Sequence, residues 1–236
     1  MADEKEKSKT HKLSLKGSSK LVAEFFEYSI NTILFQRGVY PAEDFSPVKK
    51  YGLNMLVSSD DQVRAYIKKI MSQLNKWMLG GKITKLVVVI TDKETEEHIE
   101  RWQFDVSYPP ATVDPNTLQV QLLSKPSKRS HAQNSGDKEN AALDAGQIPQ
   151  EKTEKEIQDE IQAIFRQITA SVTFLPQLDG NCTFNVLVYA DQDSDVPVEW
   201  GDSDAKEIKD GEKVQLRGFS TSNHKVDTLV SYRLAD

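Results

Sequence analysis

One stretch of this chain, residues 18–38, is a helix that other parts of the fold have to enclose. Taken at about 100° per residue, its large apolar side chains point in almost every direction. Only Glu24, Glu27 and Asn31 form a continuous polar stripe. A helix that is apolar over most of its circumference is surrounded by other elements, because one buried face would leave the rest in water. We therefore predict that this helix lies at the centre of the domain.

The two ends of this stretch carry helix boundary signals. Ser18 or Ser19 can accept hydrogen bonds from the first unpaired N–H groups, and Gly38 can adopt the left-handed conformation that ends a helix. The stretch is too short and too charged to cross a bilayer, so we expect no membrane association. Residues 1–16 are rich in lysine and lack an apolar segment, so we expect a flexible tail and no secretory signal.

The composition fits one globular domain with some solvated extra length. The chain has 236 residues, of which 38% are hydrophobic. Cys182 is the only cysteine, which excludes an internal disulfide and fits a reducing compartment. The formal net charge of −6 arises within residues 191–213, where nine acidic side chains stand against three basic ones. This balance argues against nonspecific nucleic-acid binding, and we interpret the acidic segment as a solvated loop.

Helix and strand patterns alternate after the first helix. Residues 40–47 form a connector broken by two prolines, and residues 53–57 form a short strand. Ser59 and Gln62 have the spacing of a capping box, which opens a helix that ends at the glycine pair 80–81. Its apolar face comprises Val63, Tyr66, Ile67, Ile70, Met71, Leu74, Trp77 and Met78.

An antiparallel hairpin is predicted next. Residues 85–91 are a β-branched run typical of a strand buried on both faces. Residues 98–106 alternate, and we expect them to return alongside as the second strand. In that strand one face carries Trp102, Phe104 and Val106 and the other carries Arg101, Gln103 and Asp105.

The second half of the chain begins with a segment of different character. Residues 108–150 are rich in proline and small polar residues, so we predict a disordered insert. A helix over residues 151–172 and alternating strands at 181–190, 214–219 and 226–234 follow. The sum is an α+β domain, with three long helices massed on one face of a mainly antiparallel sheet.

Catalytic motifs are missing from the sequence. It has no zinc-ligand spacing, no phosphate-binding loop and no dinucleotide fingerprint. Asp191, Asp193 and Asp195 resemble the front of a calcium loop, but the required glycine and final glutamate are missing. A thiol hydrolase would need His224 to fold against Cys182; a small buried cysteine is the simpler interpretation. We therefore predict a protein that is not an enzyme and needs no metal or cofactor.

Several long stretches resemble one known family. They are VAEFFEYSINTILFQRGVYP (22–41), KYGLNMLV (50–57), KLVVVIT (85–91), ERWQFDV (100–106), IQDEIQAIFRQITASVTFLP (157–176) and LRGFSTSNHKV (216–226). The chain resembles the HORMA-domain family, specifically its spindle-assembly checkpoint members of the mitotic-arrest-deficient-two type. The resemblance covers most of the chain outside residues 1–16 and 108–150. It implies a single HORMA domain over residues 17–236, interrupted by the insert.

The resemblance implies a protein that captures an extended peptide. Family members hold a segment of a coiled-coil kinetochore partner, or of the activator of the anaphase-promoting complex, and so delay anaphase. The peptide adds a strand to a sheet edge, here implied at Phe184, Asn185, Val186, Leu187, Val188 and Tyr189. A mobile C-terminal safety belt, about residues 191–236, closes over the peptide, with implied contacts from Trp200, Leu216, Phe219, His224 and Val226.

The family also has an open and a closed state, and the two states pair with each other. The resemblance implies that this self-association uses Arg166, Gln167, Phe174 and Arg217. Taken alone, Arg166 would be an ordinary solvated helix charge. Thr228 matches a position that can carry a phosphorylatable serine, and a phosphate there would disfavour one docking of its strand. Other members of the mitotic checkpoint complex are further implied partners, and the implied location is the nucleus, unattached kinetochores and the mitotic cytoplasm.

Alternatives to this reading remain open from the sequence. One is the HORMA scaffold subunit of translesion DNA polymerase, against which ERWQFDV and FRQITASVTFLP argue. The thiol hydrolase described above is another, and a meiotic chromosome-axis role is a third, although such proteins usually carry a longer C-terminal tail. Lys138-Glu139-Asn140 in the insert spells a KEN degron, a triplet that also arises by chance.

Overall fold

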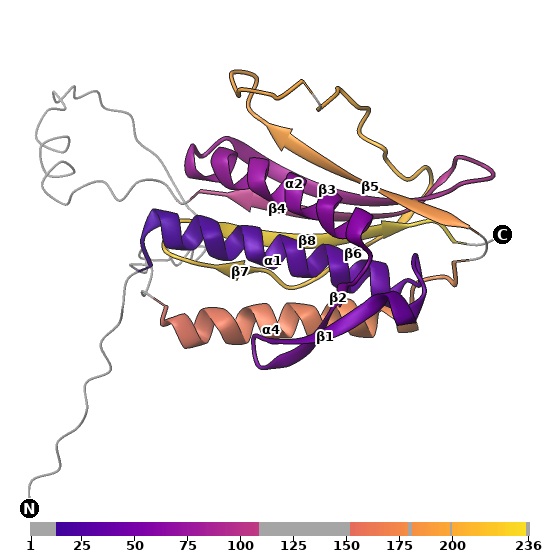
Figure 1. Cartoon of the computed structure of the whole chain (residues 1–236), viewed down its shortest axis with the longest axis horizontal. Coiled ribbons are helices and arrows are strands. Elements are labelled where there is room, and N and C mark those ends of the chain that lie inside the picture. The colour runs from indigo at the N-terminus through magenta and orange to yellow at the C-terminus, as the bar shows by residue number, and fades with distance from the viewer. Residues whose placement is uncertain (1–12, 109–151, 179–180, 199, 235–236) are drawn as a thin grey trace, which may run out of the picture.

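Three helices lie across one face of a six-stranded antiparallel sheet (Figure 1). This computed structural model describes residues 13–108, 152–178, 181–198 and 200–234. The elements are α1 (Leu15–Gln36), a 3-10 turn η1 (Ala42–Asp44), β1 (Phe45–Lys50), β2 (Leu53–Ser58), α2 (Asp61–Leu79), β3 (Ile83–Asp92), β4 (His98–Ser107), α4 (Glu154–Ala170), a 3-10 turn η2 (Ser171–Thr173), β5 (Cys182–Ala190), β6 (Glu212–Gln215), β7 (Phe219–Ser220) and β8 (Lys225–Tyr232). The predicted α+β class is thereby confirmed.

The order of strands in the main sheet is β5-β3-β4-β8-β6, with β7 also paired to β8. The predicted hairpin is β3 and β4, which occupy the middle of the sheet. Two strands from the C-terminal quarter, β6 and β8, lie at one side, and β5 forms the edge at the other side. Strands that follow each other in sequence, β5 and β6, are therefore separated by the full width of the sheet.

The helix α1 is the buried centre that its all-round apolar pattern predicts. Val22, Phe25, Phe26, Ile30 and Ile33 are fully buried, between α2, α4 and the sheet. Each fully buried side chain of this size contributes about 1.5–3 kcal/mol of transfer free energy. The helix thus serves as the surface against which the other elements assemble.

The predicted start of α1 was wrong by a few residues, and its predicted end is confirmed. The N-cap is Ser14, whose hydroxyl accepts a hydrogen bond from the Gly17 N–H. Ser18 and Ser19 lie inside the helix and are buried. At the other end, Gly38 has φ +63°, in the left-handed region that favours glycine.

The predicted capping box of α2 was also wrong. Asp60 is the N-cap and accepts hydrogen bonds from the N–H groups of Gln62 and Val63, whereas the Ser59 hydroxyl pairs with Ser46. The carboxylate of Asp60, one residue later, accepts the hydrogen bonds expected of the N-cap. Its negative charge is also stabilised by the positive end of the helix dipole. The helix ends at Gly80, as expected.

The sequence pattern missed strand β1, which contains Pro47 and pairs with β2 in a separate two-stranded sheet. This hairpin contacts two residues of the polar stripe of α1. The Tyr51 hydroxyl donates a 2.6 Å hydrogen bond to Glu24, and the Ser58 N–H donates to Asn31 at 2.8 Å. Glu24 and Asn31 of the stripe therefore attach the hairpin to α1, whereas Glu27 is exposed.

A buried ion pair joins the helical layer to the sheet. Arg37, just after α1, donates to Glu100 of β4 at 2.8 Å and also to the Pro176 carbonyl oxygen. Trp102 donates to the other carboxylate oxygen of Glu100. Burial is the main cause that raises the pKa of Glu100, and Arg37 opposes it.

The two faces of β4 differ as predicted, with one exception. Trp102, Phe104 and Val106 are buried against the helices. On the opposite face Arg101 is 1% exposed, whereas Gln103 and Asp105 on the same face are partly exposed. Residues 205–207 cover Arg101 on the side of the sheet away from the helices.

The single strand predicted at 214–219 is two short strands, β6 and β7, on the same side of β8. Gly218 lies between them, so close to β8 that an added Cβ would stand 2.4 Å from the Val226 carbonyl oxygen. The pairing with β8 is interrupted between Gln215 and Phe219. Most of the predicted insert and the KEN triplet lie outside the described residues. Among the described helices, none is long and apolar enough to cross a membrane.

Candidate peptide-binding edge and safety belt

The outer edge of β5 pairs with no strand in the described part of the chain. Backbone groups of alternate residues in a strand point to opposite sides. The Asn181 carbonyl accepts from Lys93 on the β3 side, so Thr183, Asn185 and Leu187 also point toward β3. The N–H and C=O groups of Phe184, Val186 and Val188 therefore form an outward row. A row of this kind is a template for an added strand.

The side chains of β5 place this edge between two environments. Phe184 and Val186 are buried toward the helices, Asn185 is exposed, and the half-buried residues are Leu187, Val188 and Tyr189. The predicted peptide-binding residues thus form one continuous edge strand. Their partial exposure leaves apolar surface that an added strand would cover.

The segment after β5 first runs along the helical side of this edge. The indole N–H of Trp77 on α2 donates to the Asp195 carbonyl oxygen at 2.9 Å. The ring of Trp200 packs edge-to-face on Trp77, with 5.1 Å between ring centroids. Near the start of the segment Lys82 pairs with Asp193 at 2.6 Å. We call residues 191–236 the belt from here on.

The belt then passes to the other face of the sheet. Arg101 on β4 points away from the helices and donates to the Ala205 carbonyl oxygen at 3.2 Å. Its guanidinium also lies 3.4 Å from Glu207. This contact explains the buried Arg101, because the belt covers it. In Figure 1 the orange segment after β5 runs outside that strand before it reaches β6.

The far end of the belt is anchored in the core. Strand β8 pairs with β4 over eight residues, and Leu216, Phe219 and Val226 are buried. The Phe219 ring contacts Phe25 of α1 at 4.9 Å. A loop attached to α2 on one side and to β4 and α1 on the other thus encircles the outer edge of β5.

His224 fastens this anchor to the start of α1. Its Nδ1 lies 2.6 Å from the Ser18 hydroxyl, which in turn lies 2.6 Å from the Thr221 hydroxyl. The ring is fully buried and packs against Tyr108. Burial lowers the pKa of His224 to about 4, because the charged imidazolium is poorly solvated there.

The four residues expected at a self-association surface lie on or beside α4. Arg166 and Arg217 are exposed, and Phe174 is 42% exposed. The Gln167 amide oxygen accepts a 2.7 Å hydrogen bond from the Arg217 N–H, which ties α4 to the belt within one chain. Phe174 follows the C-terminal end of α4 and contacts Tyr232.

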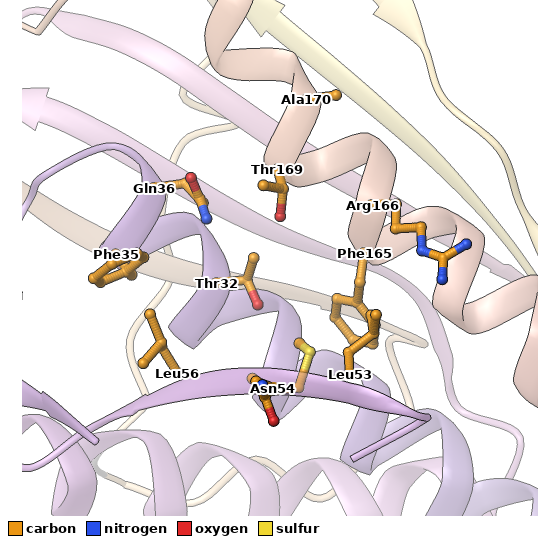
Figure 2. A pocket seen from close by; sticks show the side chains of 11 residues that line it. Thr32, Phe35, Gln36, Leu53, Asn54, Leu56, Phe165, Arg166, Thr169 and Ala170 are labelled. Carbon is orange, nitrogen blue, oxygen red and sulfur yellow. The ribbon is translucent and has the colours of Figure 1, made fainter. Parts of the chain in front are cut away.

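A pocket of about 340 Å³ lies between α1, β2 and α4 (Figure 2). Phe35, Leu53, Leu56 and Phe165 line it, and Arg166 stands at its rim with the guanidinium directed away from the centre. The pocket therefore adjoins the surface that carries Arg166.

Thr228, the expected phosphosite, is fully buried on β8, and its hydroxyl has no partner among the described residues. A phosphate cannot be accommodated there while β8 stays paired with β4. Modification would therefore require the strand to leave the sheet.

The residues needed for a thiol hydrolase do not meet. Cys182 is paired with Asp92 at one end of the sheet, and His224 precedes Lys225, which is paired with Ser107 at the other end. Strands of this length separate those ends by roughly 30 Å. Burial also raises the pKa of Cys182. Among the described residues, no group of three or more His, Cys, Asp or Glu side chains could hold a metal ion.

Sequence reasoning missed three belt or edge contacts. Trp77 was interpreted as a core aromatic only, and Arg101 was assigned to a face of its strand without a contact. Tyr66 was assigned to the apolar face of α2 but is 40% exposed and stands over β5. No local pattern marks these residues, because each contact joins elements far apart in the sequence.

Comparisons with known proteins agree with this architecture. The HORMA domain family model matches residues 18–224. The mitotic spindle checkpoint component mad2 of Schizosaccharomyces pombe is 56% identical over 221 residues, which is 94% of each chain. The mitotic spindle assembly checkpoint protein MAD2A of Homo sapiens is 40% identical, with 96% of each chain covered.

Solved structures give the same result. A chain in the crystal structure of the mitotic checkpoint complex is 51% identical, with a TM-score of 0.72, over 92% of this chain and 99% of that one. The Caenorhabditis elegans protein HTP-2, solved bound to a HIM-3 closure motif, has a TM-score of 0.66 over 98% of each chain; at 16% identity it supports the fold alone. The chain therefore belongs to the HORMA-domain family and, within it, to the Mad2 spindle-checkpoint proteins.

Proposed function

We propose that this protein acts in the spindle assembly checkpoint by capturing an extended peptide along β5, with the belt closed around it. The observation that carries the proposal is the outward backbone row of Phe184, Val186 and Val188, encircled by a belt attached on both faces of the sheet. Strand addition satisfies this row. Encirclement makes release slow, because the belt has to open first.

The guests that we propose are a segment of a coiled-coil kinetochore protein and a segment of the activator of the anaphase-promoting complex. Holding the activator delays anaphase, and other mitotic checkpoint complex members assemble on the same unit. The two sequence relatives named above, mad2 of Schizosaccharomyces pombe and MAD2A of Homo sapiens, cover nearly the whole chain and are both spindle-checkpoint proteins, so a translesion-polymerase scaffold is not favoured. The place of action is the nucleus, unattached kinetochores and the mitotic cytoplasm.

We take the described arrangement as the closed state of a two-state protein. In the open state β8 would leave β4, and the C-terminal strands would pair elsewhere. Such a switch requires two arrangements that differ by only a few kcal/mol. Phosphorylation of Thr228 would act on this equilibrium by disfavouring the buried position of β8; phosphopeptide mass spectrometry of protein from mitotic cells tests whether the site is used.

Proline at Val188 tests strand capture. The Val188 N–H points outward, so Val188→Pro removes one backbone donor that β5 offers to the guest. The ladder between β5 and β3 is not broken by this change. We expect binding of a synthetic activator peptide to weaken by at least about 10-fold, since one ladder bond is lost and the edge is stiffened.

A matched change, Val188→Ala, keeps the N–H and shortens the side chain. It should weaken binding less than the proline does. Hydrogen exchange should show that the peptide protects the amides of Phe184, Val186 and Val188 in the unaltered protein. Peptide binding without that protection, or full affinity in Val188→Pro, would exclude capture at this edge.

A further inference from the structure

Two side chains of α4 accept hydrogen bonds from the backbone of the belt. The helix lies beside β7 (Figure 1), at the side of the sheet opposite to β5. The Glu160 carboxylate accepts from the Ser220 N–H at 3.2 Å, and the Gln167 amide oxygen accepts from the Arg217 N–H at 2.7 Å. Glu160 and Gln167 are seven residues apart, so two helical turns place them on the same face of α4. Helix side chains thus satisfy backbone donors where the pairing with β8 is interrupted.

A lysine completes this contact. Lys152 precedes the N-cap of α4, and its ammonium pairs with the Glu160 carboxylate. The same ammonium donates to the Ser220 hydroxyl at 2.7 Å. Ser220 is therefore held at two points, through its N–H by Glu160 and through its hydroxyl by Lys152.

These contacts require the belt to be docked. Strand β7 pairs with β8, and β8 pairs with β4. If β8 left β4, Arg217 and Ser220 would move with it, and α4 would lose both backbone donors. A contact made in only one of two states favours that state by its own net free energy. A hydrogen bond to a charged group typically changes such an equilibrium by about 10-fold.

We propose that Glu160, Lys152 and Gln167 form a latch by which α4 holds the belt in the closed state. The inference rests on the proposed two-state belt and names the positioning residues that set how long it stays closed. Gln167 also belongs to the expected self-association surface, so its substitution would change two properties at once. Glu160 lies two turns away from it and isolates the latch.

Hydrogen exchange of the peptide-free protein tests the latch. In Glu160→Ala the amides of β8 should exchange about 10-fold faster, while those of β3 keep their rates, because the belt opens locally. Asp159→Ala is the matched control, since it removes a carboxylate from the neighbouring exposed position of α4, and it should change neither strand. Unchanged β8 exchange in Glu160→Ala, or equal acceleration of β3 and β8, would overturn the proposal.

A conservative variant separates the accepted hydrogen bond from the charge. Glu160→Gln keeps an oxygen for the Ser220 N–H and loses the charge that faces Lys152. Its β8 exchange should return to within about 3-fold of the unaltered protein. Exchange as fast as in Glu160→Ala would overturn the assignment of the Ser220 N–H as the latched group.

Release of a synthetic activator peptide gives the second readout. Glu160→Ala should release the peptide about 10-fold faster than the unaltered protein, and Glu160→Gln should restore most of the difference, because the belt has to open before the peptide leaves. Equal release from all three proteins would refute control of the guest by the latch. If the unaltered protein bound no peptide, the proposed function would fail, while the exchange experiment would still decide the role of Glu160.

Discussion

Single residues decide how firmly the belt is anchored, and His224 shows this most directly. The imidazole is buried, one nitrogen is satisfied by Ser18, and Nε2 has no partner among the described residues. A neutral ring tolerates this environment, whereas an imidazolium would leave a charged donor unpaired in the core.

We therefore expect stability to depend on pH through His224. Its pKa is about 4 in the folded protein and 6.5 as the ordinary value, so the unfolded chain binds the extra proton between them. The contribution of the neutral His224 ring to the free energy of unfolding is complete above pH 6.5 and is lost as pH falls toward 4. Between pH 7.5 and 5.0 the free energy of unfolding should fall by about 2 kcal/mol through this group. Urea unfolding at these two pH values measures it.

The control for this experiment is His224→Asn, which cannot titrate and should lose most of that pH dependence. The comparison is needed because Glu100, whose pKa is raised mainly by burial, acts in the opposite direction. An equal loss of stability between pH 7.5 and 5.0 in both proteins would exclude His224 as the cause.

At the scale of elements, the belt is a loop with two attachments and little regular structure between them. Trp77 and Trp200 hold it on the helical side of β5, and Arg101 holds it on the other face. The acidic residues that made this segment look solvated are in large part exposed, as expected. A few contacts with distant elements nevertheless fix its path.

Loosening one attachment should speed peptide release more than it affects folding. Trp200→Ala removes an edge-to-face aromatic contact, which is worth about 0.5–1.5 kcal/mol beyond its buried area. We expect dissociation of a bound peptide to become roughly 10-fold faster, with the urea midpoint nearly unchanged. Val198→Ala is the matched control, because Val198 is fully exposed in the same loop. Unchanged release from Trp200→Ala would show that the belt does not limit dissociation there.

At the scale of the whole molecule, the surface around α4 is the candidate for pairing between two copies. Arg166 and Arg217 lie exposed there, and the Gln167 contact joins the helix to the belt. A partner seated on this surface would contact both a fixed helix and a segment that moves between states. Such a surface can distinguish the closed arrangement from the open one.

Reversing the charge of Arg166 should weaken self-association without weakening the fold. Because its side chain is exposed, Arg166→Glu is expected to change stability by no more than about 0.5 kcal/mol. We expect the dimer dissociation constant, measured by sedimentation, to rise at least 10-fold. Lys155→Glu places the same charge change on an exposed position of the same helix and should leave the constant unchanged. An effect of equal size in both variants would point to net charge as the cause.

The sequence by itself determined the three helices and the central strands, whose patterns are local. The apolar circumference of residues 18–38 predicted the buried α1, the β-branched run at 85–91 predicted the central β3, and alternation predicted the inward face of β4. Family resemblance located the edge strand and the belt. Helix N-caps were misplaced by one to five residues, because several neighbouring hydroxyl and carboxylate groups can accept the same hydrogen bonds.

Only the tertiary structure decided which residues the belt contacts. The burial of Arg101, the second role of Trp77, the link between His224 and Ser18, and the position of Tyr66 over β5 all join residues far apart in the chain. Periodicity reports which face of an element avoids water. It does not report which distant segment covers that face, because that depends on how all the layers pack together.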